Sequence, residues 1–152
     1  MNCTITHSRS VEVITTVHDA LYEYNLKHTG SPRQDAKPFI CDSSEVLFLL
    51  GDDAVNYGGV VWHCDREKQK IVVDLFFIND ALRGQGYGVK LFNEFESRAR
   101  TYGLPSISVY TNTFQAPGFY QKMGYTLVKT SSAPLPALPD NCRFFFTKKL
   151  ED

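Results

Sequence analysis

The chain has 152 residues, 43% of them hydrophobic and 22% charged, and a formal net charge of −1 at pH 7. These values are typical of one globular domain with its own core, so we expect a single domain over residues 1–152 and no nucleic-acid partner, which would favour excess positive charge. No run approaches the ~18 apolar residues of a membrane helix and the N-terminus lacks the features of a signal peptide, so we expect a cytoplasmic protein without a membrane partner.

The first half of the chain predicts a strand, a long helix and three further strands. Residues 3–6 alternate as a short strand does, and apolar residues at helical spacing follow until Gly30 ends the helix. After a polar loop, the stretches EVLFLLGDD, YGGVVWHCD and KIVVDLFFI predict strands. Their short connections make them an antiparallel meander.

Two helices are predicted in the second half. Apolar residues recur at three- and four-residue intervals over residues 88–102, and Gly103 ends that helix. Proline is tolerated in the first turn of a helix, so Pro117 predicts a short helix that starts near Ala116 and is capped by Gly124.

Three more strands separate and follow these helices. They are predicted at SISVYT, YTLVK and CRFFFTKKL, the last with residues 144–146 reaching both faces of a sheet. The proline-broken stretch SSAPLPALPD predicts a loop.

The cysteines do not form a recognisable ligand set. They are Cys3, Cys41, Cys64 and Cys142, without a CxxC pair. Because metal ligands recur at short, characteristic spacings, we expect free thiols and predict that no metal is bound.

Three glycines are crowded at the start of the helix that follows KIVVDLFFI. Gly84, Gly86 and Gly88 follow Arg83 in ALRGQGYGVKLFNEF. Glycine loses the most entropy on folding, so this crowding indicates a need for bare backbone. The free N–H groups and positive dipole at a helix start favour a phosphate, and the alternative is a tight turn with close helix packing. The spacing fits neither a Rossmann loop nor a P-loop.

These motifs resemble those of the Gcn5-related N-acetyltransferases (GNAT). RGQGYG is similar to the family's Arg/Gln-x-x-Gly-x-Gly/Ala signature, APGFYQKMGY to its A-x-x-F-Y-x-K-x-G-F/Y segment, and DLFFINDALRG to its fourth strand running into the loop. The resemblance implies an α/β (α+β) fold of three layers. It has a mixed, twisted sheet of six or seven strands, flanked by helices and splayed between strands four and five.

The resemblance also implies acetyl-coenzyme A as co-substrate, lying in the splay. Its pantetheine arm is expected on the backbone of Phe77, Ile78 and Asn79. The family commonly has Asn where this chain has Thr113, and Asn112 lies one position earlier, so both stay open as a contact to this arm. The pyrophosphate is expected on the residues of the glycine loop, which are Arg83, Gly84, Gln85, Gly86, Tyr87 and Gly88.

Tyr120 is the expected general acid. When an amine displaces coenzyme A from its thioester a thiolate leaves, and a phenol with a pKa of about 10 is suited to protonate it. The family uses a tyrosine at this position in that role. The alternative is one more aromatic side chain that packs a helix on the sheet.

Asp74 interrupts an apolar strand, where strict alternation places its side chain on the face of Val72, Phe76 and Ile78. We interpret it as a residue of the acceptor cleft that attracts the substrate ammonium or relays its proton to water, since a pKa of about 3.9 is low for an efficient base. The alternative is a solvated or salt-bridged residue of the sheet.

The sequence thus predicts transfer of acetyl from acetyl-coenzyme A to a primary amine by direct attack in a ternary complex, with a small-molecule acceptor favoured over a protein. The alternative is a non-catalytic acyl-coenzyme A binding module on the same fold. The first helix and the loop SSAPLPALPD are expected to recognise the acceptor. Glu23, Tyr24 and Asn25 are candidates for this cleft, but the favoured interpretation is the ordinary polar face of an amphipathic helix. The family includes homodimers, and no feature here sets the oligomeric state.

Overall fold

The computed structural model describes residues 2–30, 38–113 and 117–150. Seven strands form one sheet in the order β1-β2-β3-β4-β5-β7-β6. In chain order the elements are β1 (Cys3–Ser8), α1 (Val11–Thr29), β2 (Glu45–Gly51), β3 (Asn56–Asp65), β4 (Lys70–Ile78), η1 (Asp80–Leu82), α2 (Tyr87–Ala99), η2 (Arg100–Tyr102), β5 (Ser106–Asn112), α3 (Gly118–Lys122), β6 (Thr126–Ser132) and β7 (Cys142–Lys149).

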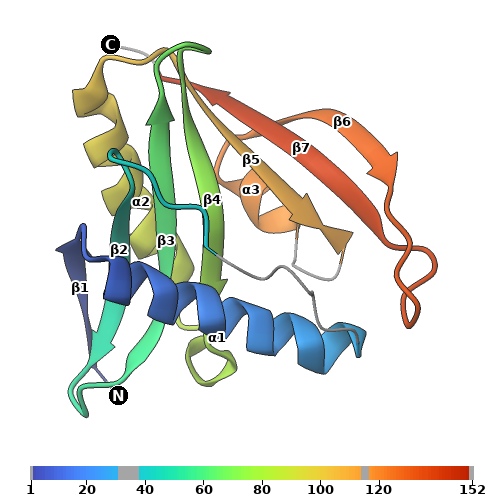
Figure 1. Cartoon of the computed structure of the whole chain (residues 1–152), viewed down its shortest axis with the longest axis horizontal. Helices are drawn as coiled ribbons and strands as arrows, with labels where there is room; N and C mark the ends of the chain where they lie inside the picture. The colour runs from blue at the N-terminus through green and yellow to red at the C-terminus, as the bar shows by residue number, and fades with distance from the viewer. Residues whose placement is uncertain (1, 31–37, 114–116, 151–152) are drawn as a thin grey trace.

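The sheet opens between β4 and β5. All other neighbours are antiparallel, whereas these two run parallel and pair only from Ile71–Ile107 to Val73–Val109. Beyond these pairs the two strands diverge, as Figure 1 shows. The remainder of β4 therefore presents one backbone edge that none of the described strands covers. This confirms the mixed, splayed sheet expected from the sequence.

Helices cover both faces of the sheet, which gives three layers (Figure 1). On one face α1 buries Ile14 and Val17 against β2, β3 and β4. On the other face α2 buries Phe92 and Phe95, and α3 packs beside it. α1 ends at Gly30 as expected, because this residue adopts a left-handed φ of 69° and its N–H donates to the Leu26 carbonyl at 2.8 Å.

A buried ionic group ties α2 to the far half of the sheet. Glu96 of α2 accepts hydrogen bonds from the Tyr125 hydroxyl at 3.0 Å and from Lys148 Nζ of β7 at 2.8 Å. Lys148 also donates to the Met123 carbonyl at the end of α3. The network therefore fixes α3 relative to α2 and β7.

β4 carries one extra residue opposite β3. Val61 pairs with Leu75 and Trp62 with Val73, which leaves Asp74 without a partner in the ladder. This is a β-bulge, and it bends the strand and redirects the side chains that follow. The bulge lies directly after the last residue pair that joins β4 to β5.

The bulge corrects one expectation from the sequence. Phe76 and Ile78 pack with the core under α2, whereas Leu75 packs under α1 and Asp74 opens into a cavity beside α1. The prediction that Asp74 shares a face with Phe76 and Ile78 is therefore wrong. Strict alternation fails because the extra residue changes which face each later residue occupies.

The second half follows the expected order with two differences at element ends. β6 extends through Ser132, so the predicted loop loses its first two residues to a strand. α3 ends at Lys122, before Gly124, and the expected start near Ala116 lies outside the described residues. Phe146 is buried in the core and Phe145 faces the other side, where it contacts Tyr110. Within the described ranges, no helix is long and apolar enough to cross a membrane.

Candidate active site

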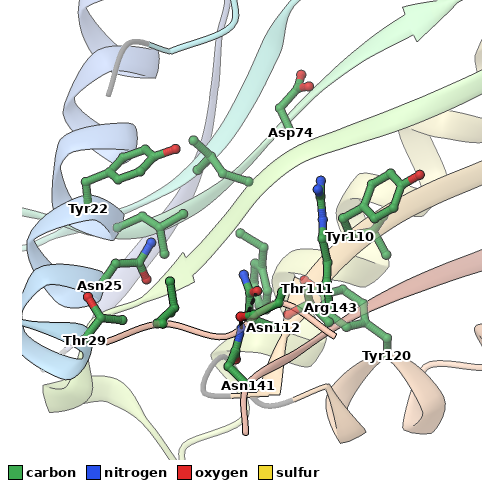
Figure 2. A pocket seen from close by; sticks show the side chains of 16 residues that line it. Tyr22, Asn25, Thr29, Asp74, Tyr110, Thr111, Asn112, Tyr120, Asn141 and Arg143 are labelled. Atoms are coloured by element: carbon green, nitrogen blue, oxygen red, sulfur yellow. Dashed lines mark hydrogen bonds between the residues drawn. The ribbon is translucent and has the colours of Figure 1, made fainter. Parts of the chain in front are cut away.

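Two cavities meet at the splay. The larger, of about 420 Å³, lies between α1, β4, β5 and the start of β7, and the smaller, of about 370 Å³, lies between β4, α3 and the glycine loop (Figure 2 shows the larger). Leu21, Phe76 and Tyr120 line both. A molecule held in the smaller cavity can therefore reach one held in the larger.

The glycines of the loop have two different roles. Gly84 and Gly86 have left-handed φ angles of 77° and 81°, and a Cβ on either would meet no atom within 4 Å. Gly86 precedes the first turn of α2, which no side chain caps. At Gly88, by contrast, a Cβ would lie 3.3 Å from Phe119 and 3.4 Å from Phe76. Gly84 and Gly86 thus leave open backbone beside the smaller cavity, and Gly88 allows close helix packing.

Arg83 is held at the rim of the smaller cavity. Its Nε lies 3.0 Å from Asp80 Oδ1 and donates to the Ile78 carbonyl at 3.3 Å. Its guanidinium carbon lies 4.8 Å from the centre of the Tyr24 ring, and both residues line this cavity. The arrangement orients a cation at the entrance to the glycine loop.

Gln85 and Tyr87 use their side chains within the protein. Gln85 Nε2 donates to the Ala81 carbonyl at 3.2 Å, and the Tyr87 hydroxyl accepts from the Cys3 N–H of β1 at 3.2 Å. The Tyr87 ring nevertheless lines the smaller cavity, whereas Gln85 does not. These contacts fix the loop against β1 and η1.

The open edge of β4 offers the backbone of Phe76 and Ile78. The Asn79 N–H donates to the Tyr57 carbonyl of β3 at 2.8 Å, and its Oδ1 caps η1 by accepting from the Ala81 N–H. Along an antiparallel pair, every second residue directs its backbone N–H and C=O toward the partner strand. The backbone groups of Phe77, two residues before Asn79, therefore also face β3. Phe76 and Ile78 then direct their backbone groups into the splay. Of the three residues expected to face the pantetheine arm through their backbone, only Ile78 directs its backbone groups away from β3.

Tyr120 lies where the two cavities meet. Its side chain is 4% exposed and packs among Phe76, Phe92 and Phe146. Burial raises the pKa of Tyr120 above its ordinary value of 10. The phenol therefore keeps its proton over the neutral range, which is the state that a general acid needs.

Asp74 is paired with a residue that the sequence did not single out. His63 Nδ1 of β3 lies 2.7 Å from Asp74 Oδ2, and each side chain is 14% exposed. Burial raises the pKa of Asp74, although the hydrogen bond and charge of His63 act against it. The hydrogen bond to Asp74 raises the pKa of His63. Asp74 faces the larger cavity, so the pair can hold or accept a proton there.

Stability should fall as the pH rises above neutrality, and His63→Gln should flatten this dependence. Folding raises the pKa of His63 above its unfolded value of 6.5. Protonated His63 therefore stabilises the fold below about pH 6.5, and this contribution is lost as the pH rises through the folded pKa. Urea unfolding of both proteins between about pH 6 and about pH 9 measures the effect. An unchanged slope in His63→Gln would contradict it.

The structure separates the two candidates near the end of β5. The Thr113 hydroxyl accepts from the Cys142 N–H at 2.9 Å and donates to the Cys142 carbonyl at 3.3 Å, so it joins two strands. Asn112 lines the larger cavity, and its Oδ1 accepts from Asn141 Nδ2 at 3.1 Å. Neither residue lines the smaller cavity, so their expected contact to the pantetheine arm stays a prediction, and of the two only Asn112 faces the larger cavity.

The first helix contributes to both cavities. Asn25 lines the larger one and Tyr24 the smaller, whereas Glu23 lines neither. Ala133 and Leu135, from the loop predicted after β6, also line the larger cavity. Asn25 of the first helix and part of the loop after β6 therefore face this cavity as expected, whereas Glu23 and Tyr24 do not.

Residues 42–127 match the family model described as acetyltransferase (GNAT) domain. The chain belongs to this family. It is 34% identical over 110 residues to blasticidin-S acetyltransferase of Streptomyces morookaense. The aligned region covers 72% of this chain and 74% of that protein.

Solved structures share the fold. A GNAT-family acetyltransferase from Staphylococcus aureus superposes with a TM-score of 0.75 at 14% identity, over 97% of this chain and 100% of that chain. A structure from Bacillus anthracis, described as a streptothricin acetyltransferase in complex with acetyl coenzyme A, gives a TM-score of 0.62 at 16% identity. The superposition covers 72% of this chain and 64% of that one.

Proposed function

We propose that the protein transfers the acetyl group of acetyl-coenzyme A to a primary amine of a small molecule, by direct attack within a ternary complex. The observation that carries the proposal is the meeting of two cavities at Tyr120, one lined by the glycine loop and one by Asp74. The relative named blasticidin-S acetyltransferase supports a small-molecule acceptor.

The smaller cavity fits a coenzyme A thioester. The open backbone at Gly84 and Gly86, the uncapped first turn of α2 and the cation of Arg83 suit a pyrophosphate. The backbone groups of Phe76 and the N–H of Ile78 suit the amides of a pantetheine arm, whereas the Ile78 carbonyl already accepts from Arg83 Nε. When bound, acetyl-coenzyme A would supply the acetyl group as a thioester.

The larger cavity fits the acceptor amine. Asp74 attracts the ammonium and, with His63, takes up its proton directly or through water. The freed nitrogen forms a bond to the acetyl carbon, and the carbon–sulfur bond breaks. A backbone N–H at the open edge of β4 stabilises the developing oxyanion, and Tyr120 gives its proton to the departing sulfur. Because both reactants are bound at one junction, the reaction proceeds as an effectively unimolecular step, without a bimolecular encounter in solution.

Thiol release from acetyl-coenzyme A across a panel of primary amines tests the proposal. An acetyltransferase releases thiol only when a suitable amine is present. A non-catalytic binding module would bind acetyl-coenzyme A and release none with any amine.

Gly86→Val should weaken acetyl-coenzyme A binding by about tenfold, because the branched side chain fills open space beside the phosphate site. It should also cost about 1–2 kcal/mol of stability, since φ at this position is left-handed. Gly103→Val is the matched control, because Gly103 has a φ of 73°, open surroundings and no place in either cavity. Calorimetry should show a similar loss of stability in both variants and a loss of affinity in Gly86→Val alone. Equal affinities would contradict the phosphate role of the loop.

A further inference from the structure

The larger cavity carries opposite charges on its two walls. Among the sixteen described residues that line it, only Asp74 and Arg143 are charged. Asp74 lies on β4 and Arg143 on β7, across the splay (Figure 2). The Asp74 carboxylate is paired with His63, whereas Arg143 forms no ion pair with any residue that the structure describes. The charge at this cavity without an ionic partner among the described residues is therefore that of Arg143, whose side chain is exposed to solvent.

Arg143 lies against an aromatic ring at the exposed side of the cavity, and its side chain donates no hydrogen bond to the residues that the structure describes. Its guanidinium carbon lies 4.3 Å from the centre of the Tyr110 ring, and Tyr110 contacts Phe145, its partner across the β5–β7 ladder, at 4.6 Å. A cation above an aromatic ring is attracted by the ring itself, so the N–H groups stay available to a ligand. Figure 2 shows Arg143 extending beside Tyr110 along the cavity wall.

The strand that carries Arg143 is fixed at its base. Asn141 Nδ2 donates to Asn112 Oδ1 at 3.1 Å and to the Ala133 carbonyl at 2.9 Å. Arg143 itself pairs with Asn112 in the ladder between β5 and β7. The backbone at the start of β7 is therefore anchored to β5 and to the loop after β6.

We infer that the acceptor is an amine that also carries an oxyanion, a carboxylate or a phosphate, which Arg143 binds while Asp74 faces the amine. The inference rests on the proposed function of this cavity as the acceptor site. A guanidinium presents N–H donors in a planar fork that matches the two oxygens of such a group. An acceptor with positive charges alone would meet the uncompensated charge of Arg143. The coenzyme phosphates are an unsuitable partner, because Arg143 does not line the cavity of the glycine loop.

Matched pairs of amines test this inference. A panel of primary amines is assayed by thiol release, each as the free acid and as its neutral amide, together with ethanolamine and its phosphate ester. The wild type should prefer the charged member of a pair by about tenfold in kcat/KM. The ratio of kcat/KM for the charged member to that for the neutral member is compared between the carboxylate and phosphate pairs. The pair with the larger ratio shows which of the two groups is preferred.

Variants then assign the preference to Arg143. Arg143→Gln should bring the ratio near one by raising KM for the acids, with KM for acetyl-coenzyme A unchanged. Lys149→Gln removes the same charge from the other end of β7, outside both cavities, and should keep the preference. A preference that persists in Arg143→Gln, or turnover without any preference, would overturn the inference and leave the proposed function intact.

If no amine releases thiol, the proposed function is contradicted. The oxyanion site is then tested separately by a binding measurement. The acids are titrated into each protein in the presence of coenzyme A and followed by calorimetry. Weaker binding to Arg143→Gln than to Lys149→Gln supports an oxyanion site at Arg143. Equal binding to the two variants overturns it.

Discussion

Tyr120→Phe is expected to lower kcat by roughly 10²–10⁴, the range that general acids contribute, with acetyl-coenzyme A affinity and melting temperature close to wild type. The substitution keeps the ring and its contacts with Phe76, Phe92 and Phe146, and removes only the hydroxyl. Single-turnover rates are the appropriate measurement, because slow product release can mask a chemical step in the steady state. A wild-type single-turnover rate would remove Tyr120 from the mechanism.

Tyr125→Phe is the matched control for this prediction. Tyr125 belongs to the same aromatic cluster and is equally buried, but it donates to Glu96 at 3.0 Å and lines neither cavity. Removal of this hydroxyl should cost about 1.5–3 kcal/mol of stability, the usual value of a hydrogen bond to a charged group, and leave the rate unchanged. The two variants should therefore separate a loss of rate from a loss of stability.

Asp74→Asn should lower kcat/KM for the amine by roughly 10- to 100-fold while acetyl-coenzyme A affinity stays nearly unchanged. The asparagine side chain still accepts a hydrogen bond from His63, so residue 74 keeps this contact. The negative charge that faces the larger cavity is lost. Initial velocities measured against each substrate separately give both constants. An equal loss of coenzyme affinity would show that Asp74 only supports the sheet.

Asp19→Asn provides the comparison for Asp74. Asp19 is also paired with a histidine, His18, at 3.1 Å, but it lies on α1 and lines neither cavity. The same chemical change should leave both kinetic constants at wild-type values. A similar loss in this variant would point to a general effect of charge and not to the acceptor cavity.

The parts of the fold that depend on local pattern could be predicted from the sequence. The spacing of Phe92, Phe95 and Ala99 predicts the buried face of α2, and all three are fully buried. Helical spacing follows from the geometry of one helix, and the glycine loop and the position of Tyr120 follow from short contiguous motifs. The mixed sheet and its splay came with the family resemblance that these motifs carry, whereas the strand order β5-β7-β6 was not predicted.

Features set by contacts between distant segments could not be predicted in this way. The bulge at Asp74 exists only in the pairing of β4 with β3, and it decides which face each later side chain occupies. The His63 partner of Asp74 becomes visible once β3 and β4 are placed side by side. The hydrogen bond from the backbone N–H of Asn79 to the Tyr57 carbonyl also depends on this pairing. A sequence signal for His63 was its position on the strand next to an isolated acid.

If an amine in the larger cavity attacks a thioester held beside Tyr120, product analysis with initial-velocity kinetics tests this attack most directly. Each coenzyme A thiol released should be matched by one acetylated nitrogen, identified by mass spectrometry. Double-reciprocal lines should intersect, as both substrates are bound before either product leaves. Thiol release without an amine, acetylation of oxygen, or the parallel lines of a covalent acetyl-enzyme would contradict this direct attack.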